Sequence, residues 1–252
     1  MSNAEALSED LKSQLMSVAT STLTHQLQMR GIQSTFLTGL RPLHPELRMV
    51  GRARTVRYVA LREDLQRSYS GAGSAQQQAV ETIEPGEVLV IEARGAPDAG
   101  TIGDTYSTRA FVRGAAGIIT DGALRDTPAI AALGQPVYSQ GSHGSTLGRR
   151  HMAFSFNEPI TCAGVFVAPG DVIVGDGEGA VVIPTALVEE VARDAVAQEE
   201  VEAFALERIT AGEPSYGLFP LAASRRAEFT AWAAARRKQL PRAGETQGKS
   251  EC

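Results

Sequence analysis

The sequence predicts an α/β fold that combines a mixed sheet with C-terminal helices. Apolar runs alternate with helical patterns between residues 76 and 139, a rhythm typical of right-handed βαβ units around a parallel sheet. Three short apolar runs then follow one another through tight turns after residue 164, which indicates an antiparallel part of the sheet. A long helical periodicity begins near residue 185.

The individual elements follow from periodicity and from turn residues. Helices are expected where apolar positions recur at helical spacing, over residues 5–31, 76–83, 104–113, 127–133, 185–209 and 222–240. Strands are expected where apolar or β-branched runs lie between turn signals, at 49–59, 88–93, 117–121, 136–139, 164–167, 172–175 and 180–183. We expect one domain over residues 1–240, its last part a helical extension, and a polar tail over 241–252.

Composition limits the partners and the compartment. The 252-residue chain has a formal net charge of −5, so no global basic field favours nucleic acid. Its two cysteines, Cys162 and Cys252, form no disulfide framework, which fits a reducing cytosol. The N-terminus has no signal-peptide pattern, and the apolar runs are too short to span a bilayer. We therefore expect a cytoplasmic protein with neither nucleic-acid nor membrane partners.

Two polar pairs occupy matching positions in consecutive strand–helix units. Gly103-Asp104 stands where a helix begins after a buried strand, and Arg125-Asp126 lies just past the next strand. Ligands of open α/β sheets bind at the carboxyl ends of strands, where free helix amides favour an anion. An arginine suits a carboxylate, and aspartate oxygens suit Mg²⁺ or Mn²⁺. The pairs could thus hold an α-keto acid. Spacing alone leaves an alternative open, in which Asp104 and Asp126 only cap helices and Arg125 bridges them.

Other polar stretches have a plainer interpretation. Residues 70–74, SGAGS, lack the Lys-Ser/Thr of a P-loop and favour a flexible loop. Residues 176–179, DGEG, lack EF-hand spacing and favour a turn. His143 has no Gly-x-Ser-x-Gly elbow beside it and is expected in a surface loop near the substrate mouth. Glu199, Glu200 and Glu202 favour a solvated helix face, or else one of them reaches a neighbouring subunit's site.

At Gly100, Asp104 and Arg125-Asp126 the chain resembles the RraA-like family. The shared pattern is a glycine, three residues, an aspartate, twenty residues and then Arg-Asp. The stretches EPGEVLV (84–90), GAAG (114–117) and PGDVIVGD (169–176) add to the likeness, which covers roughly residues 15–210. That family includes the 4-hydroxy-4-methyl-2-oxoglutarate/4-carboxy-4-hydroxy-2-oxoadipate aldolases, which are class II pyruvate aldolases, and regulators of ribonuclease activity.

The resemblance implies a layered α/β/β, swivelling-domain-like fold and a set of site roles. Arg125 would bind the pyruvyl carboxylate, and Asp126 would hold Mg²⁺ or Mn²⁺, partly through water. Asp104 would support the water shell of the metal. The backbone amides of Gly103, Asp104, Thr105 and Tyr106 would help to bind the substrate. A glutamate of an adjacent subunit, Glu199 or Glu202, would complete the site of a homotrimer or hexamer.

The implied function is a metal-dependent lyase that cleaves a C–C bond of a small 2-oxo acid. Retro-aldol cleavage to pyruvate and oxaloacetate decarboxylation both pass through a metal-stabilised enolate. The alternatives are a protein-binding regulator of ribonuclease activity, or dehydration or tautomerisation of a 2-oxo acid at the same site. The chain departs from the family pattern at Thr127-Pro128-Ala129, which lacks the acidic residue common there, at residues 143–151 and in the extension that contains Trp232.

Overall fold

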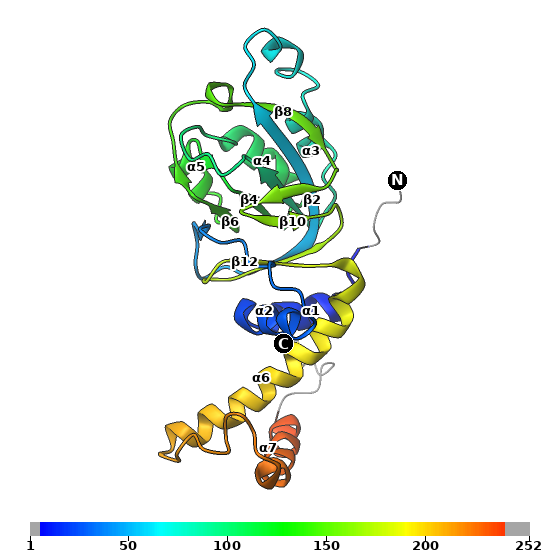
Figure 1. Ribbon diagram of the computed structural model, residues 1–252, viewed down its shortest axis with the longest axis vertical. Helices are drawn as coiled ribbons and strands as arrows, with labels where there is room; N and C mark the ends of the chain where they lie inside the picture. Colours follow the sequence, from blue (N-terminus) through cyan, green and yellow to red (C-terminus); the bar gives the residue numbers. More distant parts are fainter. Residues whose placement is uncertain (1–5, 240–252) are drawn as a thin grey trace, which may run out of the picture. The chain divides into compact units, whose positions relative to one another are not determined.

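Strand β2 (Met49–Ala60) organises an eight-stranded mixed sheet in the computed structural model, which describes residues 6–239 (Figure 1). On one side β2 pairs in parallel with β3, and β4 and β6 continue in parallel beyond it. On the other side its first half pairs with β11 and its second half with β8, both antiparallel. The mixed sheet is therefore confirmed.

The strands and helices of the described chain have these bounds. The strands are β1 (Arg41–Pro42), β2, β3 (Glu87–Glu92), β4 (Gly117–Thr120), β5 (Ala123–Leu124), β6 (Val137–Ser139), β7 (Gly141–Ser142), β8 (His151–Phe156), β9 (Ile160–Cys162), β10 (Val165–Val167), β11 (Val172–Gly175) and β12 (Ala180–Ile183). The α-helices are α1 (Glu9–Ser17), α2 (Thr20–Met29), α3 (Ala75–Glu81), α4 (Asp104–Val112), α5 (Thr127–Ala131), α6 (Val188–Thr210) and α7 (Arg226–Gln239). Short 3₁₀ turns are η1 (Gln66–Ser68), η2 (Leu147–Arg149), η3 (Thr185–Leu187) and η4 (Ala223–Arg225).

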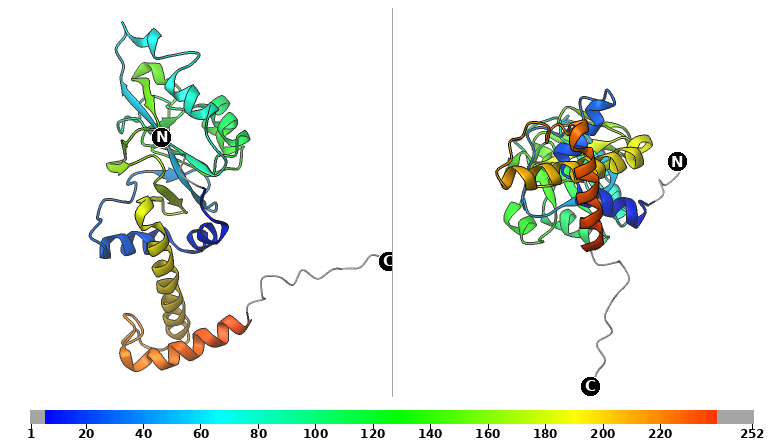
Figure 2. Two further views of the ribbon diagram at one scale, coloured as in Figure 1. Left: turned by 90° about the vertical axis from the view of Figure 1, so that its right-hand side faces the viewer. Right: turned by 90° about the horizontal axis from the view of Figure 1, so that it is seen from below.

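The sheet is buried on both faces, which gives the layered α/β/β arrangement (Figure 2). Successive strand residues point to opposite faces, so Leu89 and Ile91 of β3 pack against helices α3, α4 and α5. Their neighbours Val88 and Val90 pack toward the hairpin formed by β9 and β10. A strand buried on both faces has a continuous apolar run, and β3 has one.

A third cluster joins the strands β11 and β12 to helices α1, α2 and the start of α6. The single helix expected over residues 5–31 is wrong in one respect, because the chain is extended at Val18 and Ala19 and forms two helices. Asp176 stabilises this break, since its carboxylate accepts hydrogen bonds from Thr20 N (2.9 Å) and Thr20 Oγ1 (2.8 Å). The acidic turn at 176–179 thus acts as a distant cap for α2.

The chain divides into two compact units, Met1–Ala195 and Val196–Cys252. The second contains the later part of α6 with η4 and α7, around a small core of Phe204, Leu218 and Trp232. Trp232 Nε1 donates to Glu207 Oε2 at 2.9 Å. The expected single domain over 1–240 stays a prediction, and the polar tail 241–252 lies outside the described residues.

The sequence prediction missed the strands whose partners are remote or whose length is two or three residues. These are β1, β5, β7, β8 and β9. The missed strand β8 is the largest of them, and its sequence, HMAFSF, has no alternation between apolar and polar residues. In the part of the chain that the structure describes, no helix is both long and apolar enough to cross a membrane.

Candidate active site

A segment without regular structure brings the two polar pairs together. After β3 the chain passes Gly100, which forms a parallel bridge with Ala123 of β5. Thr101 N donates to Ala123 O at 2.8 Å, and Arg125 N donates to Ile102 O at 3.0 Å. Residues 100–102 therefore run beside residues 123–125 as an additional parallel pair. Each segment ends on one of the polar pairs, so Gly103-Asp104 and Arg125-Asp126 emerge side by side.

Two glycines permit this close approach. A Cβ atom at Gly100 would lie 2.6 Å from Arg125 Cβ and 2.9 Å from the carbonyl oxygen of Ser145. A Cβ atom at Gly103 would lie 2.9 Å from Asp126 Oδ2. Gly103 is also the N-cap of α4. The missing side chain thus lets the Asp126 carboxylate lie beside the start of a helix, where negative charge is favoured.

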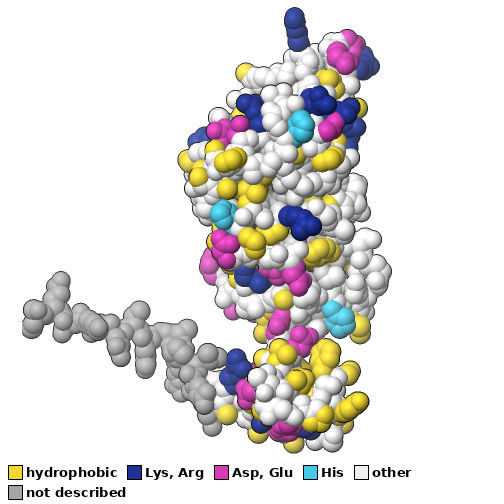
Figure 3. All heavy atoms as spheres, turned by 90° about the vertical axis from the view of Figure 1, so that its left-hand side faces the viewer, with side chains coloured by type: hydrophobic (Ala, Val, Ile, Leu, Met, Phe, Trp, Pro, Cys, Tyr) yellow, Lys and Arg dark blue, Asp and Glu magenta, His cyan; other side chains and the backbone are white. Residues whose placement is uncertain are grey.

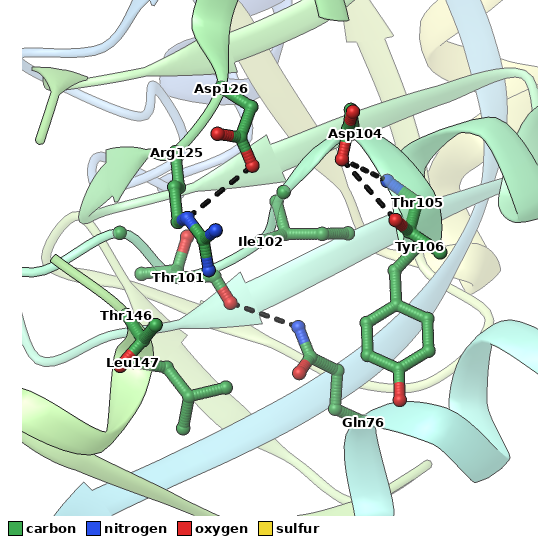
Figure 4. Close-up of a pocket in the computed structure, with 12 residues that line it drawn as sticks. Gln76, Thr101, Ile102, Asp104, Thr105, Tyr106, Arg125, Asp126, Thr146 and Leu147 are labelled. Atoms are coloured by element: carbon green, nitrogen blue, oxygen red, sulfur yellow. Dashed lines mark hydrogen bonds and ion pairs between the residues drawn. The ribbon is translucent and has the colours of Figure 1, made fainter. Parts of the chain in front are cut away.

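These residues line a pocket of about 300 Å³ (Figure 4). The predicted substrate and metal residues, Gly103 to Tyr106 with Arg125 and Asp126, are all in its wall. The lining residues are Gln76, Gly100, Thr101, Ile102, Gly103, Asp104, Thr105, Tyr106, Arg125, Asp126, Thr146 and Leu147. Asp104 and Asp126 lie along one edge, and the guanidinium group of Arg125 lies beside Asp126. The spacing argument therefore placed the two pairs correctly on one rim of the sheet.

Asp126 is held in an unusual backbone conformation and has few partners. Its φ of 58° is left-handed, a region that aspartate tolerates better than most residues. Its side chain is 37% exposed, and Oδ2 lies 3.4 Å from Arg125 Nε. It makes no side-chain capping bond to α5. Although Asp126 is the N-cap residue of α5, its carboxylate does not cap that helix.

Asp104 occupies the first position of α4 rather than the capping position. Its Oδ1 accepts a hydrogen bond from Thr105 N at 2.7 Å, and Oδ2 has no described protein partner. The first backbone bond of the helix is from Ser107 N to Gly103 O, so the amides of Asp104 and Tyr106 precede it. Arg125 pairs with Asp126 among the described residues and does not bridge the two aspartates.

The floor of the pocket is held by two buried donors that the sequence did not single out. Gln76 Nε2 donates to Thr101 O at 2.9 Å (Figure 4). Tyr58 Oη donates to the same oxygen at 3.0 Å. Burial, and then the nearby Tyr106, raises the pKa of Tyr58 above its ordinary value. Tyr58 therefore stays protonated and acts as a donor. Because the carbonyl oxygen of Thr101 accepts two hydrogen bonds, the path of residues 100–103 is fixed.

The carboxylates at the pocket fit a hydrated divalent cation. Mg²⁺ keeps several waters and is commonly bound through one or two carboxylates. Asp126 is half-exposed with one long ion pair, and Asp104 has one carboxylate oxygen outside its helix contact. No group of three His, Cys, Asp or Glu side chains gathers anywhere in residues 6–239. The oxygen donors thus suit a water-rich magnesium or manganese shell and not a zinc site.

Comparison with known proteins decides the family. Residues 20–182 match the sequence model of the RraA-like family, described as Aldolase/RraA. The chain belongs to the RraA-like family. A relative from Halalkalibacterium halodurans, named "Putative 4-hydroxy-4-methyl-2-oxoglutarate aldolase", is 33% identical over 77% of this chain and 85% of its own length.

Solved structures of the RraA-like fold agree with this assignment. RraAS2 from Streptomyces coelicolor, described as an unusual member of the RNase ES inhibitor RraA family, superposes with a TM-score of 0.73. It is 30% identical, and the match covers 79% of this chain and 97% of that one. An uncharacterized protein from Pseudomonas syringae gives a TM-score of 0.73 at 26% identity, over 85% and 98% of the two chains.

A loop over residues 143–150 covers one side of the pocket in this RraA-like protein. Gly100 N donates to Ser145 O at 2.8 Å, and His143 N donates to Leu124 O at 2.8 Å. Thr146 and Leu147 of the loop line the pocket, whereas His143 does not. Instead, His143 Nδ1 accepts from Ser145 N at 3.0 Å and shapes the turn.

The two candidates for the glutamate expected to complete a neighbouring site, Glu199 and Glu202, lie on α6 in the second unit. Gln198 Nε2 donates to Glu202 Oε1 at 2.8 Å. Glu200 instead pairs with Arg237, Oε2 to Nη2, at 2.7 Å. Neither Glu199 nor Glu202 lines the pocket of its own chain. Their role in another subunit stays a prediction.

Proposed function

We propose that this chain is a divalent-metal-dependent lyase that cleaves a C–C bond of a small 2-oxo acid. Retro-aldol cleavage to pyruvate and decarboxylation of oxaloacetate are the two reactions in its scope. One observation carries the proposal: Arg125, the start of α4 and the carboxylates of Asp104 and Asp126 share a pocket of about 300 Å³. The name of the relative from H. halodurans supports an aldolase.

The substrate would bind through its 2-oxo acid end. Arg125 is 44% exposed at its side chain and directs Nε toward Asp126, which leaves its terminal nitrogens for a carboxylate. The amides of Asp104 and Tyr106 at the start of α4 offer further donors to an anion. Thr101 O, held from below by Gln76 and Tyr58, fixes these donors relative to one another.

Mg²⁺ or Mn²⁺ would be held by Asp126, with Asp104 supporting its water shell. The cation, when bound, supplies the Lewis acidity that draws electron density from the 2-oxo group. In the retro-aldol reaction the C3–C4 bond breaks, and its electron pair moves toward C3 to form the pyruvate enolate. The 4-hydroxyl group would lose its proton to a water beside the Asp104 carboxylate, and C3 would then take up a proton. In decarboxylation the same bond releases CO₂.

The decisive experiment measures pyruvate release from 4-hydroxy-2-oxo acids and from oxaloacetate, with Mg²⁺ and after its removal by a chelator. We expect activity that depends on the metal and is lost in Asp126→Asn. The variant Asp64→Asn is a matched control, because Asp64 is exposed and pairs only with Arg62 among its described contacts. Turnover that ignores both the chelator and the Asp126 substitution would contradict the proposal.

A regulator of ribonuclease activity is the second candidate, and the likeness to RraAS2 supports it. A regulator acts through a protein surface and does not need the aspartates of the pocket. Binding to a ribonuclease that is equal in wild type and Asp126→Asn, together with no turnover of any 2-oxo acid, would favour this function.

We also propose that the protein assembles as a homotrimer or hexamer, as its family resemblance implies. Light scattering of the purified chain gives the mass directly. Substituting Glu199 or Glu202 by glutamine should then lower turnover without changing that mass, if either residue serves a neighbouring site. A monomer with full activity would contradict the assembly.

A further inference from the structure

A second pocket of about 260 Å³ adjoins the candidate active site. We propose that it receives the distal part of the substrate and selects a group that carries no charge. This inference rests on the proposed function, because the 2-oxo acid end must lie in the first pocket. It names the substrate of the retro-aldol reaction more narrowly, as a 4-hydroxy-2-oxo acid whose far end is apolar or hydroxylated instead of a second carboxylate.

The two pockets share a wall. Gln76, Tyr106, Thr146 and Leu147 line both of them. In Figure 4, Leu147 and Tyr106 lie on either side of Gln76, and all three are away from Asp126. A molecule anchored at Arg125 therefore meets the second pocket as it extends away from the carboxylates. Nothing else in the first pocket is needed to guide it there.

The chemistry of the two linings differs sharply. The first pocket contains Arg125, Asp104 and Asp126. The second contains no Asp, Glu, Lys or Arg, and its own members are neutral. The residues that line only the second pocket include Gln66, Tyr69, Ser70, Ser74, His151 and Met152. A carboxylate that enters such a lining loses water and gains no cation, which is costly.

His151 at the back of the second pocket is neutral and incompletely satisfied. It is fully buried, and its Nε2 has no hydrogen-bond partner in the protein. Arg94 Nη2 lies 3.4 Å from the other ring nitrogen, Nδ1, which favours the tautomer with the proton on Nε2. Burial, and then the charge of Arg94, lowers the pKa of His151 to about 4. The ring is therefore neutral and adds no charge to the lining of the second pocket.

The remaining wall favours an apolar or aromatic occupant. Tyr69 is half-buried and stacks on Phe154, with ring centroids 5.5 Å apart and an interplanar angle of 27°. Buried Met152 lies on β8 beside His151. A thioether and a tyrosine ring are favourable neighbours for a planar apolar group.

The test compares two 2-oxo acids, one with an uncharged apolar far end and one with a charged far end. Phenylpyruvate carries an uncharged ring, and 2-oxoglutarate carries a second carboxylate, while both keep the 2-oxo acid end. Isothermal titration of the Mg²⁺-loaded full chain should give a dissociation constant at least about tenfold lower for phenylpyruvate. Pyruvate release from 4-hydroxy-2-oxo-4-phenylbutanoate should likewise exceed release from 4-hydroxy-2-oxoglutarate in kcat/KM.

A charge introduced into the second pocket should reverse the preference. Ser70 is exposed at its rim, so Ser70→Arg adds a cation without disturbing the core. Ser68→Arg is the matched control, because Ser68 is equally exposed two residues away and does not line this pocket. We expect Ser70→Arg to bind 2-oxoglutarate more tightly than wild type does, and Ser68→Arg to leave both dissociation constants unchanged.

The outcomes separate this inference from the proposed function. Equal affinity for the two acids, or tighter binding of 2-oxoglutarate by wild type, overturns the inference and leaves the lyase proposal intact. A preference for phenylpyruvate without cleavage of any 2-oxo acid supports the second pocket and counts against the lyase. Binding of neither acid overturns both.

Discussion

Two aspartates that lie five residues apart, Asp121 after β4 and Asp126 after β5, have opposite surroundings. Asp121 is 3% exposed and accepts hydrogen bonds from the amides of Ala93 (2.5 Å), Gly95 (3.0 Å) and Ala163 (3.2 Å). Asp126 is half-exposed, and its described partner is Arg125 at 3.4 Å. The carboxylate oxygens of Asp121 are used in hydrogen bonds that hold the fold, whereas the carboxylate of Asp126 remains accessible to a ligand.

The difference teaches how a structural carboxylate can be told from a functional one. Burial raises the pKa of Asp121, and its three backbone hydrogen bonds oppose that rise. These bonds join the loops after β3 and β9 to the end of β4, which is a structural task. Asp126 lacks such bonds and has a left-handed backbone, so its side chain contributes little to the stability of the fold.

The largest expected effect is on activity at Asp126. Asp126→Asn keeps a residue type that tolerates the left-handed backbone but removes the charge that would hold the metal. We expect pyruvate release to fall about 100-fold or more, with the free energy of unfolding changed by less than about 0.5 kcal/mol. Steady-state kinetics and chemical denaturation measure the two quantities. A large loss of stability would show that Asp126 is a structural carboxylate like Asp121, and would contradict the distinction between them.

The reverse pattern is expected at Asp121. Asp121→Ala leaves three backbone amides without their acceptor in a buried place, so the free energy of unfolding should fall by about 3 kcal/mol. Where the variant remains folded, kcat should change far less than in Asp126→Asn. Denaturation with urea tests this, and an unaltered midpoint would show that the bonds of Asp121 are not needed.

The substitution Gly103→Ala, which adds a methyl group, should lower activity as Asp126→Asn does. Its Cβ would press on Asp126 Oδ2 from 2.9 Å and displace that carboxylate, so we expect about a tenfold loss of kcat/KM. Gly144→Ala provides the control, because a Cβ there meets nothing within 4 Å. Equal kinetics in the two variants would mean that the position of the Asp126 carboxylate is unimportant.

The smallest expected effect concerns His151, which is buried like Asp121 yet keeps an unpaired atom. With its pKa lowered to about 4, the folded protein holds the ring neutral, while the unfolded chain protonates it near its ordinary value of 6.5. The stability linked to this group is complete above about pH 6.5 and is lost as the pH falls toward 4. The loss at pH 5.5 is about 1 kcal/mol.

Denaturation of His151→Gln at pH 5.5 and 7.5 measures that contribution. The substitution should flatten the pH dependence between these values. Parallel curves for wild type and His151→Gln would contradict a neutral His151 in the folded state.

Much of the first unit could be predicted because its signals are local. The βαβ rhythm placed α3, α4, β3 and β4 within a few residues, and the Gly-x₃-Asp and Arg-Asp spacing placed both polar pairs at one rim. The net charge of −5 gave no reason to expect a nucleic-acid partner. Basic and acidic side chains are interspersed on the face of the molecule in Figure 3. The absence of a nucleic-acid partner nevertheless stays a prediction.

The rest depends on contacts that no local pattern carries. The break at Val18 requires Asp176 from a remote turn, and the run of residues 100–102 beside β5 requires hydrogen bonds in a segment with no strand signature. The second pocket requires β8, which the sequence prediction missed, to place His151 opposite the 61–74 connection. Residues 143–151 had drawn attention only as a departure from the family pattern.

The left-handed backbone at Asp126 also limits the residues that can replace it over evolution. A side chain branched at Cβ is disfavoured at a φ of 58°, whereas asparagine and glycine fit. A descendant that lost the metal chemistry but kept this turn would therefore tend to carry Asn or Gly at the position. Asn or Gly at this position would then indicate that the reaction had been lost while the backbone conformation was kept.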